Sequence, residues 1–127
     1  MYTSKENKGV FKTIESHKTE YENPIRLNKG ENVKLGERAP EKNWKDWIWA
    51  ENNKKEGGWV PIQIVDFSEN QQQGIILEDY SAKELNINKG ELITKLKSIN
   101  GWTWVRKTDD NDEGWIPNEI IEKKKYN

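Results

Sequence analysis

The sequence predicts an all-β protein made of two tandem, five-stranded β-barrels of one small type. Apolar and polar residues alternate along much of the chain, as in half-buried strands, and no segment keeps the 3.6-residue apolar spacing of an amphipathic helix. One outline occurs twice, at 46–61 and at 101–117: two tryptophans at positions i and i+2, a polar run, then Gly-Trp-aliphatic-Pro. A repeated outline predicts one supersecondary unit present in two copies.

Each copy of this outline predicts a β-hairpin. Side chains alternate faces along a strand, so Trp47 and Trp49 share one face in the first copy, as do Trp102 and Trp104 in the second. The polar run supplies turn-forming residues. The closing proline has no N–H to donate to a sheet, so it marks the end of the second strand.

The remaining elements follow in chain order. We expect strands at 10–14, 25–27 and 33–35, with turns at Asn23-Pro24 and at Asn28-Lys29-Gly30. A single helical turn is expected after the proline of each hairpin. The second copy repeats this plan, because 85–91 aligns with 25–31. These elements predict a first domain at 9–66, a linker at 67–74 and a second domain at 75–122.

Composition fits two small domains. The chain has 127 residues, 32% hydrophobic and 34% charged, with seven tryptophans. Each half has about 60 residues, near the lower limit for folding without metals or disulfides. Large aromatic side chains offset the shortage of aliphatic ones, since each buries roughly 150 to 250 Å².

Charge and composition also exclude several classes of function. The net charge of −1 shows none of the basic excess typical of a nucleic-acid interface. The absence of cysteine excludes disulfides and thiol catalysis. No apolar run approaches the ~18 residues of a membrane span, and the first residues lack the apolar core of an export signal. We therefore expect a cytoplasmic protein that does not enter a membrane.

The second copy carries a run of motifs that resembles a family. The segments ILEDYSAKELNINKGELI, NGWTWV and EGWIPNEII follow one another at 75–122. They resemble a Src homology 3 domain: an ALYDY motif, an acidic loop, a Lys-Gly-acidic turn, a tryptophan-led strand, and Gly-aromatic-aliphatic-Pro before a helical turn. Residues 9–66 match more loosely, with VFKTI at the place of ALYDY. The whole chain resembles bacterial proteins with two tandem variant domains of this type.

The resemblance implies a non-catalytic module that binds a protein or peptide through an aromatic groove, usually a proline-rich segment in the polyproline II conformation. In the second copy the implied groove residues are Tyr80, Trp102 and Pro117, with the Tyr80 hydroxyl free to bond a ligand carbonyl. Acidic Glu78 and Glu84 border this site, so we expect a basic, proline-containing ligand.

The first copy matches the groove pattern less fully. The resemblance implies an auxiliary site there at Trp47, Pro61 and Tyr21. Both copies lack the last tyrosine of the family pattern, because Ile64 and Ile120 stand in its place. We therefore expect weaker binding than a complete groove would give.

Other functions stay open or are not expected. Recognition of a cell-wall peptide or glycan is one alternative, and a nucleic-acid-binding barrel with stacking aromatics is another. No nucleophile is paired with a base and no glycine-rich phosphate loop is present, so we expect no enzyme and no cofactor. The run at 109–114 only faintly resembles a calcium loop, because the glutamate at position twelve would fall at Ile120. We expect no metal, a loop residue at His17, and a monomer.

Overall fold

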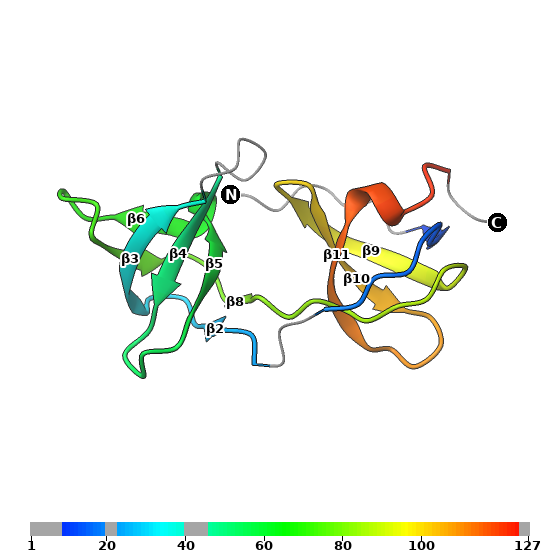
Figure 1. Ribbon diagram of the computed structural model, residues 1–127, viewed down its shortest axis with the longest axis horizontal. Helices are drawn as coiled ribbons and strands as arrows, with labels where there is room; N and C mark the ends of the chain where they lie inside the picture. Colours follow the sequence, from blue (N-terminus) through cyan, green and yellow to red (C-terminus); the bar gives the residue numbers. More distant parts are fainter. Residues whose placement is uncertain (1–8, 20–22, 40–45, 125–127) are drawn as a thin grey trace. The chain divides into compact units, whose positions relative to one another are not determined.

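The computed structural model describes residues 9–19, 23–39 and 46–124, which form an all-β protein (Figure 1). The chain divides into two compact units. Among the described residues, unit 1 comprises those within 23–82, and unit 2 comprises 9–19 together with 83–124. Unit 1 is therefore one continuous segment, whereas unit 2 is assembled from two separate segments of the chain.

Unit 1 contains an antiparallel sheet of five strands. Its order is β5-β4-β3-β7-β6, and a short β2–β8 pair lies outside this sheet. The bounds are β2 (Arg26–Leu27), β3 (Asn32–Arg38), β4 (Trp47–Glu51), β5 (Gly57–Pro61), β6 (Val65–Phe67), β7 (Gln73–Ile76) and β8 (Tyr80–Ser81). The predicted hairpin is confirmed, because Trp47 lies opposite Pro61 and Trp49 opposite Trp59.

Unit 2 contains a sheet of four strands in the order β1-β9-β10-β11. The bounds are β1 (Val10–Lys12), β9 (Leu92–Ile99), β10 (Trp102–Lys107) and β11 (Glu113–Pro117). A bridge between Thr13 and Ile121 takes the place that the β6–β7 pairing has in unit 1. One buried cluster forms the core: Phe11, Leu85, Ile87, Ile93, Val105, Ile116, Ile120 and Ile121.

A short 3-10 turn follows the last hairpin strand of each unit. Turn η2 (Ile62–Ile64) comes after Pro61, and η3 (Asn118–Ile120) after Pro117, which confirms the predicted helical turns. Both prolines are extended, with φ of −64° and −66°, the value that their rings impose. Each turn buries its last isoleucine, so it closes one end of a core.

The Asn-Lys-Gly turn has the same construction in both units. Gly30 and Gly90 each have φ of +88°, and a Cβ on either would meet nothing within 4 Å. Glycine is therefore required for its backbone conformation and not for space. The acid after each glycine caps the turn: Asn28 N donates to Glu31 Oε1 at 3.0 Å and Asn88 N to Glu91 Oε2 at 2.8 Å.

Each unit takes its first strand from the other copy of the repeat. Unit 2 consists mainly of the second copy but contains β1 of the first, and unit 1 consists mainly of the first copy but contains β7 of the second. Strand β1 pairs with β9 of unit 2, where Phe11 lies opposite Ile93. Strand β7 pairs with β3 and β6 of unit 1, where Gly74 lies opposite Val33. We call this arrangement the strand exchange.

The strand exchange changes the role of the segment at 67–74, which we expected to link two domains. In the structure it belongs to a hairpin inside unit 1, where β6 and β7 pair and Ser68 N donates to Gln73 O at 2.9 Å. One passage between the units instead lies between Ala82 and Lys83. The units thus differ in extent from the domains expected at 9–66 and 75–122, because each exchanges its first strand.

The strand exchange predicts which fragments of the chain fold. A fragment of residues 23–82 contains every strand of unit 1 and should give a dispersed amide spectrum and a cooperative thermal transition. A fragment of residues 74–123 lacks β1, so its core loses Phe11, and it should give neither. Folding of 74–123 by itself, together with failure of 23–82, would show that each copy completes its own unit.

Candidate functional site

The structure brings together only some of the residues expected to form the groove. Trp102 and Pro117 lie opposite each other on β10 and β11 of unit 2. Tyr80 lies on β8 in unit 1, is only 6% exposed, and donates its hydroxyl to the carbonyl of Trp59 at 2.9 Å. The expectation of a free Tyr80 hydroxyl is therefore wrong, because the strand exchange places this tyrosine in unit 1, where its hydroxyl is bonded.

His17 takes the place beside Trp102 that we expected for a tyrosine. The two rings meet edge to face, with centroids 5.8 Å apart and planes at 77°. The imidazole Nε2 lies 2.8 Å from Glu84 Oε1, and both side chains are about a fifth exposed, at 18% and 19%. The backbones of His17 and Ile87 exchange two hydrogen bonds of 2.9 Å. His17 lies between β1 and β2, outside the named strands, as expected of a loop residue, but it is held on both sides.

We name His17, Glu84, Trp102 and Pro117 the His17 cluster. All four residues belong to unit 2 and are partly exposed. The cluster combines an indole, a proline ring, an imidazole and a carboxylate within one unit. Of the predicted site residues it contains Trp102, Pro117 and Glu84.

The backbone beneath the His17 cluster is fixed by buried polar contacts. Thr103, next to Trp102, is 1% exposed and donates its hydroxyl to Asn118 Oδ1 on η3. Its oxygen also lies 2.8 Å from Ser98 Oγ on β9. Asn118 N donates to Gly101 O at 2.9 Å. The start of strand β10, at Trp102, is therefore tied to both β9 and η3.

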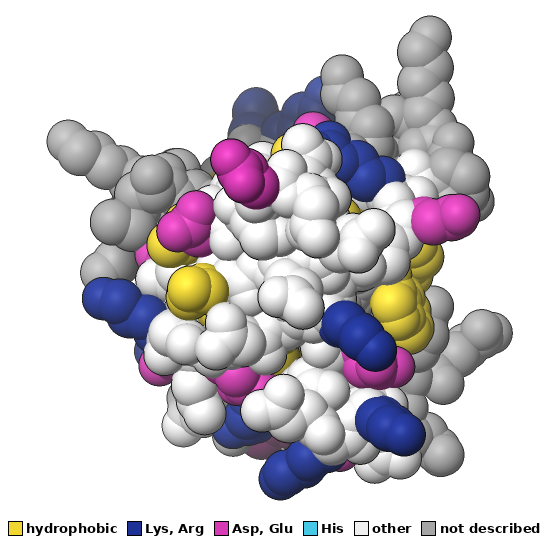
Figure 2. All heavy atoms as spheres, turned by 90° about the vertical axis from the view of Figure 1, so that its left-hand side faces the viewer, with side chains coloured by type: hydrophobic (Ala, Val, Ile, Leu, Met, Phe, Trp, Pro, Cys, Tyr) yellow, Lys and Arg dark blue, Asp and Glu magenta, His cyan; other side chains and the backbone are white. Residues whose placement is uncertain are grey.

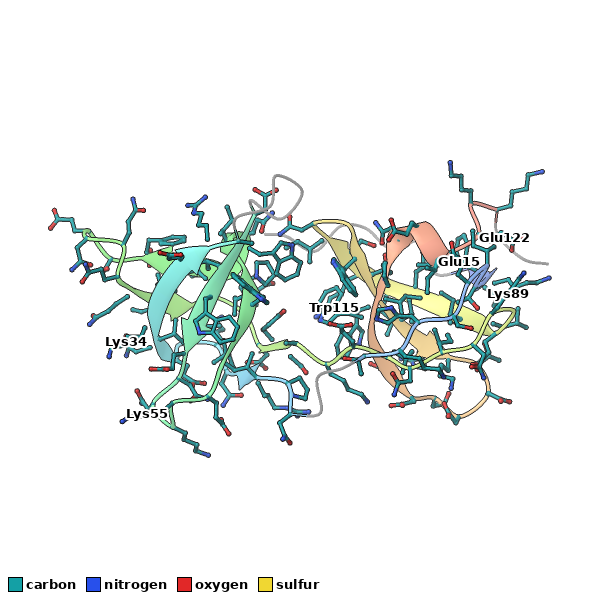
Figure 3. All side chains as sticks on the ribbon, viewed as in Figure 1. Glu15, Lys34, Lys55, Lys89, Trp115 and Glu122 are labelled. Carbon is teal, nitrogen blue, oxygen red and sulfur yellow. The ribbon has the colours of Figure 1, made fainter. Side chains whose placement is uncertain are left out.

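A second pair of tryptophans continues the same face of the hairpin. Trp104 meets Trp115, labelled in Figure 3, edge to face with centroids 5.3 Å apart. Lys97 Nζ lies 5.8 and 5.9 Å from the two ring centres, within the range of cation–π attraction. Thr103 and Val105, which alternate with these tryptophans, are 1% and 0% exposed. The predicted alternation along this strand is confirmed.

Glu113 connects this tryptophan pair to the charged edge of the hairpin. Trp104 Nε1 donates to Glu113 Oε1 at 2.8 Å, and Arg106 Nε donates to Oε2 at 3.0 Å. The hydrogen bond from Trp104, helped by that from Arg106, lowers the pKa of Glu113. In the loop between β10 and β11, Lys83 Nζ donates to Asp112 Oδ1 at 2.7 Å, and this hydrogen bond lowers the pKa of Asp112. Both carboxylates are thus stabilised in the charged form.

The Glu113 contacts predict an acid-dependent loss of stability. Because its folded pKa lies below the unfolded one, ionised Glu113 stabilises the protein above the unfolded pKa, and this stabilisation disappears as pH falls through the folded pKa. Glu113→Gln should therefore be less stable than the wild type at pH 7. The difference should shrink between about pH 5 and about pH 2.

Urea unfolding at several pH values, followed by tryptophan fluorescence, measures this difference. Glu119→Gln is the matched control, since it removes an exposed carboxylate of the same unit. A difference between wild type and Glu113→Gln that stays constant with pH would contradict the role given to the ionised group.

In unit 1 the described residues that correspond to Trp102, Pro117 and His17 are buried. Trp47 lies opposite Pro61 and is 5% exposed, Pro61 is buried, and Tyr80 bonds to Trp59 as described. Tyr21, the remaining residue of the expected auxiliary site, lies outside the described residues. The partly exposed groove residues are therefore those of unit 2.

Glu78 belongs to unit 1, whereas Trp102 and Pro117, which it was expected to border, belong to unit 2. It lines a hollow of about 420 Å³ with Lys29, Gln63, Leu77 and Asp79. The wall of this hollow is held by Asp79 Oδ1, which accepts from Lys29 N at 2.8 Å.

Three large apolar residues are exposed in the part of unit 1 that the structure describes. Ile75, Leu77 and Trp49 are 43%, 45% and 40% exposed. On the face drawn in Figure 2, hydrophobic side chains occur as separate spots among polar and charged ones. Scattered residues of this kind are usual on a protein surface.

Two other features, a metal site and a membrane-spanning helix, were sought among the described residues. In the ranges that the structure covers, no group of three His, Asp or Glu side chains is arranged to hold a metal ion. No helix within those same ranges has the length and apolar character needed to cross a membrane.

The two units and the His17 cluster define a pair of small β-barrel modules with aromatic residues beside a proline at the end of a hairpin. The family model described as "Variant SH3 domain" matches the chain twice, at residues 10–68 and 74–123. The chain belongs to this family. Domains of this type generally mediate protein interactions. A search of curated proteins and a search of solved structures gave no match.

Proposed function

We propose that the protein is a non-catalytic module that binds an extended peptide across the His17 cluster of unit 2. The observation that carries the proposal is a partly exposed indole, Trp102, opposite Pro117 and in edge contact with the His17 ring. An aromatic anchor with fixed surroundings loses little conformational freedom on binding. This arrangement suits a ligand that is itself stiff and extended.

The apolar part of the cluster accounts for the preferred conformation of the ligand. Trp102 and Pro117 have few rotatable bonds, and the Thr103 contacts fix the strand between them. A polyproline II segment has little internal freedom to lose and presents proline rings that pack against an indole. We therefore assign this surface to a proline-containing segment.

The polar part of the cluster accounts for the preferred charge. Glu84 Oε1 is bonded to His17, and Oε2 has no further hydrogen bond within the described part of the chain. A carboxylate oxygen beside an indole suits a Lys or Arg of the ligand. The proposed ligand therefore carries a basic residue next to its proline-containing segment.

The groove offers limited apolar area, so we expect a Kd of about 10 to 100 µM, or about 5.5 to 7 kcal/mol. Ile120, at the position where the family pattern has a further tyrosine, is 5% exposed and packs in the core. It therefore contributes no aromatic surface to the groove. Engagement of both units by one partner would raise the affinity through effective concentration.

Binding of a peptide library by the full chain tests this proposal. The probes are peptides of about 12 residues with two central prolines, flanked by Arg in one set and by Glu in the other. Trp102→Ala should weaken binding of the Arg set at least about tenfold, because the truncated residue is the central anchor. Trp49→Ala is the matched control, since it removes an exposed tryptophan of unit 1.

Isothermal calorimetry and the indole N–H signals give the readout. Peptides of the Glu set should bind more weakly than those of the Arg set, because Glu84 repels them. If Trp102→Ala binds the Arg set as tightly as the wild type does, the His17 cluster is not the binding site.

A further inference from the structure

The first strands of the two copies make the same backbone hydrogen bonds in their two units. Thr13 N donates to Glu91 O at 3.0 Å and Ile76 N to Glu31 O at 2.9 Å. The bonds from Gly90 N to Thr13 O and from Gly30 N to Ile76 O measure 2.8 and 2.7 Å. These backbone hydrogen bonds therefore do not distinguish the two first strands, whereas the side chains of the two strands differ.

The largest difference between the two strands is Phe11 against Gly74. Phe11 is 2% exposed in the core of unit 2 and lies opposite Ile93. Lys95 Nζ lies 4.1 Å from the centre of its ring. If Gly74 took this place, a void the size of a phenyl ring would open in the core.

Unit 1 has no room for a phenyl ring at the equivalent place. A Cβ on Gly74 would lie 2.5 Å from Val65 Cγ1 and 3.4 Å from Leu35 Cδ1. Val65 belongs to β6 and is 6% exposed, and its β-branched side chain has little freedom to move aside. Leu35 occupies the position that Lys95 has in unit 2. Phe11 therefore fits unit 2 and is excluded from unit 1.

The two exchanged segments are 11–17 and 74–80. Their last residues, His17 and Tyr80, also favour the exchanged pairing. His17 bonds to Glu84 in unit 2, whereas the residue aligned with Glu84 in the first copy is Pro24, which has no carboxylate. Tyr80 bonds to the carbonyl of Trp59 in unit 1. The aligned carbonyl in unit 2, on Trp115, accepts from Leu85 N at 3.0 Å, so one of its two lone pairs is already used.

We infer that Phe11 and Gly74, helped by His17 and Tyr80, select the exchanged pairing and so determine which side chain completes the groove of unit 2. In this chain the selection gives that groove His17. If each copy kept its own first strand, the groove would contain Tyr80, with a phenol in place of an imidazole beside Glu84. Phe11 and Gly74 thus act as positioning residues for a site that they do not line. This inference does not depend on the proposed ligand.

Disulfide trapping in the full chain tests the inference, since the native sequence has no cysteine. The exchanged pairing places Lys12 opposite Leu92, and Asn32 opposite Ile75. Lys12→Cys with Leu92→Cys therefore reports the exchanged pairing. Lys12→Cys with Asn32→Cys reports the pairing in which each copy keeps its own strand. Monomers isolated by size exclusion are compared, so that bonds between chains are not counted.

The decisive variant trades the two segments, placing GIILEDY at 11–17 and FKTIESH at 74–80, with overall composition unchanged. In the native background we expect the 12–92 disulfide to exceed the 12–32 disulfide at least about tenfold. In the traded background we expect that ratio to invert, because each segment then matches the unit of its own copy. An exchanged pairing that persists in the traded background would overturn the inference.

The ring protons of the single histidine provide a second readout. In the native chain they lie beside Trp102, which shifts their resonances. In the traded variant the histidine at position 80 should return to Trp102, and the shifts should persist. If the pairing stays exchanged, the histidine lies in unit 1 and the shifts are lost, which again contradicts the inference. Phe11→Leu, which keeps an apolar side chain, is the conservative control and should retain the 12–92 disulfide.

Discussion

The pairing of β1 with β9 is the contact on which the rest of unit 2 depends. It brings Phe11 into the core and, six residues later, His17 beside Trp102. The same pairing leaves the first strand of the second copy to complete unit 1. One choice of strand partner therefore sets the core of unit 2 and the composition of the His17 cluster.

Local patterns in the sequence were sufficient to predict the elements of the fold. The i, i+2 tryptophans and the closing Gly-Trp-aliphatic-Pro predicted both hairpins, and the prolines predicted η2 and η3. These features depend on short-range rules of side-chain alternation and turn chemistry. The strand exchange could not be predicted from such short-range rules, because the two copies have the same pattern and offer the same backbone partners to either first strand. It depends on the volumes at Phe11, Gly74 and Val65, which no periodicity records.

The same limit explains what was missed at the site. Trp102, Pro117 and Glu84 were predicted within unit 2, but Tyr80 was assigned there on the assumption that each copy is self-contained. The signal for His17 was present, because Glu15-Ser16-His17 aligns with Glu78-Asp79-Tyr80. Ser16 Oγ and Asp79 Oδ1 even accept the equivalent hydrogen bonds, from Lys89 N at 3.0 Å and Lys29 N at 2.8 Å. Aligning the ALYDY motif with 10–14 placed this segment three residues too early.

Because unit 1 is a continuous insertion between the two segments of unit 2, the chain has a defined order of mechanical loading. Tension applied before β1 and after η3 acts directly on unit 2, where Thr13 bridges Ile121 and Glu122 N donates to Lys12 O at 2.8 Å. Unit 1 bears no load until those contacts separate. In a longer polypeptide under strain, the contacts of the His17 cluster would therefore be lost first, while the barrel inserted at Asn23–Ala82 stayed folded.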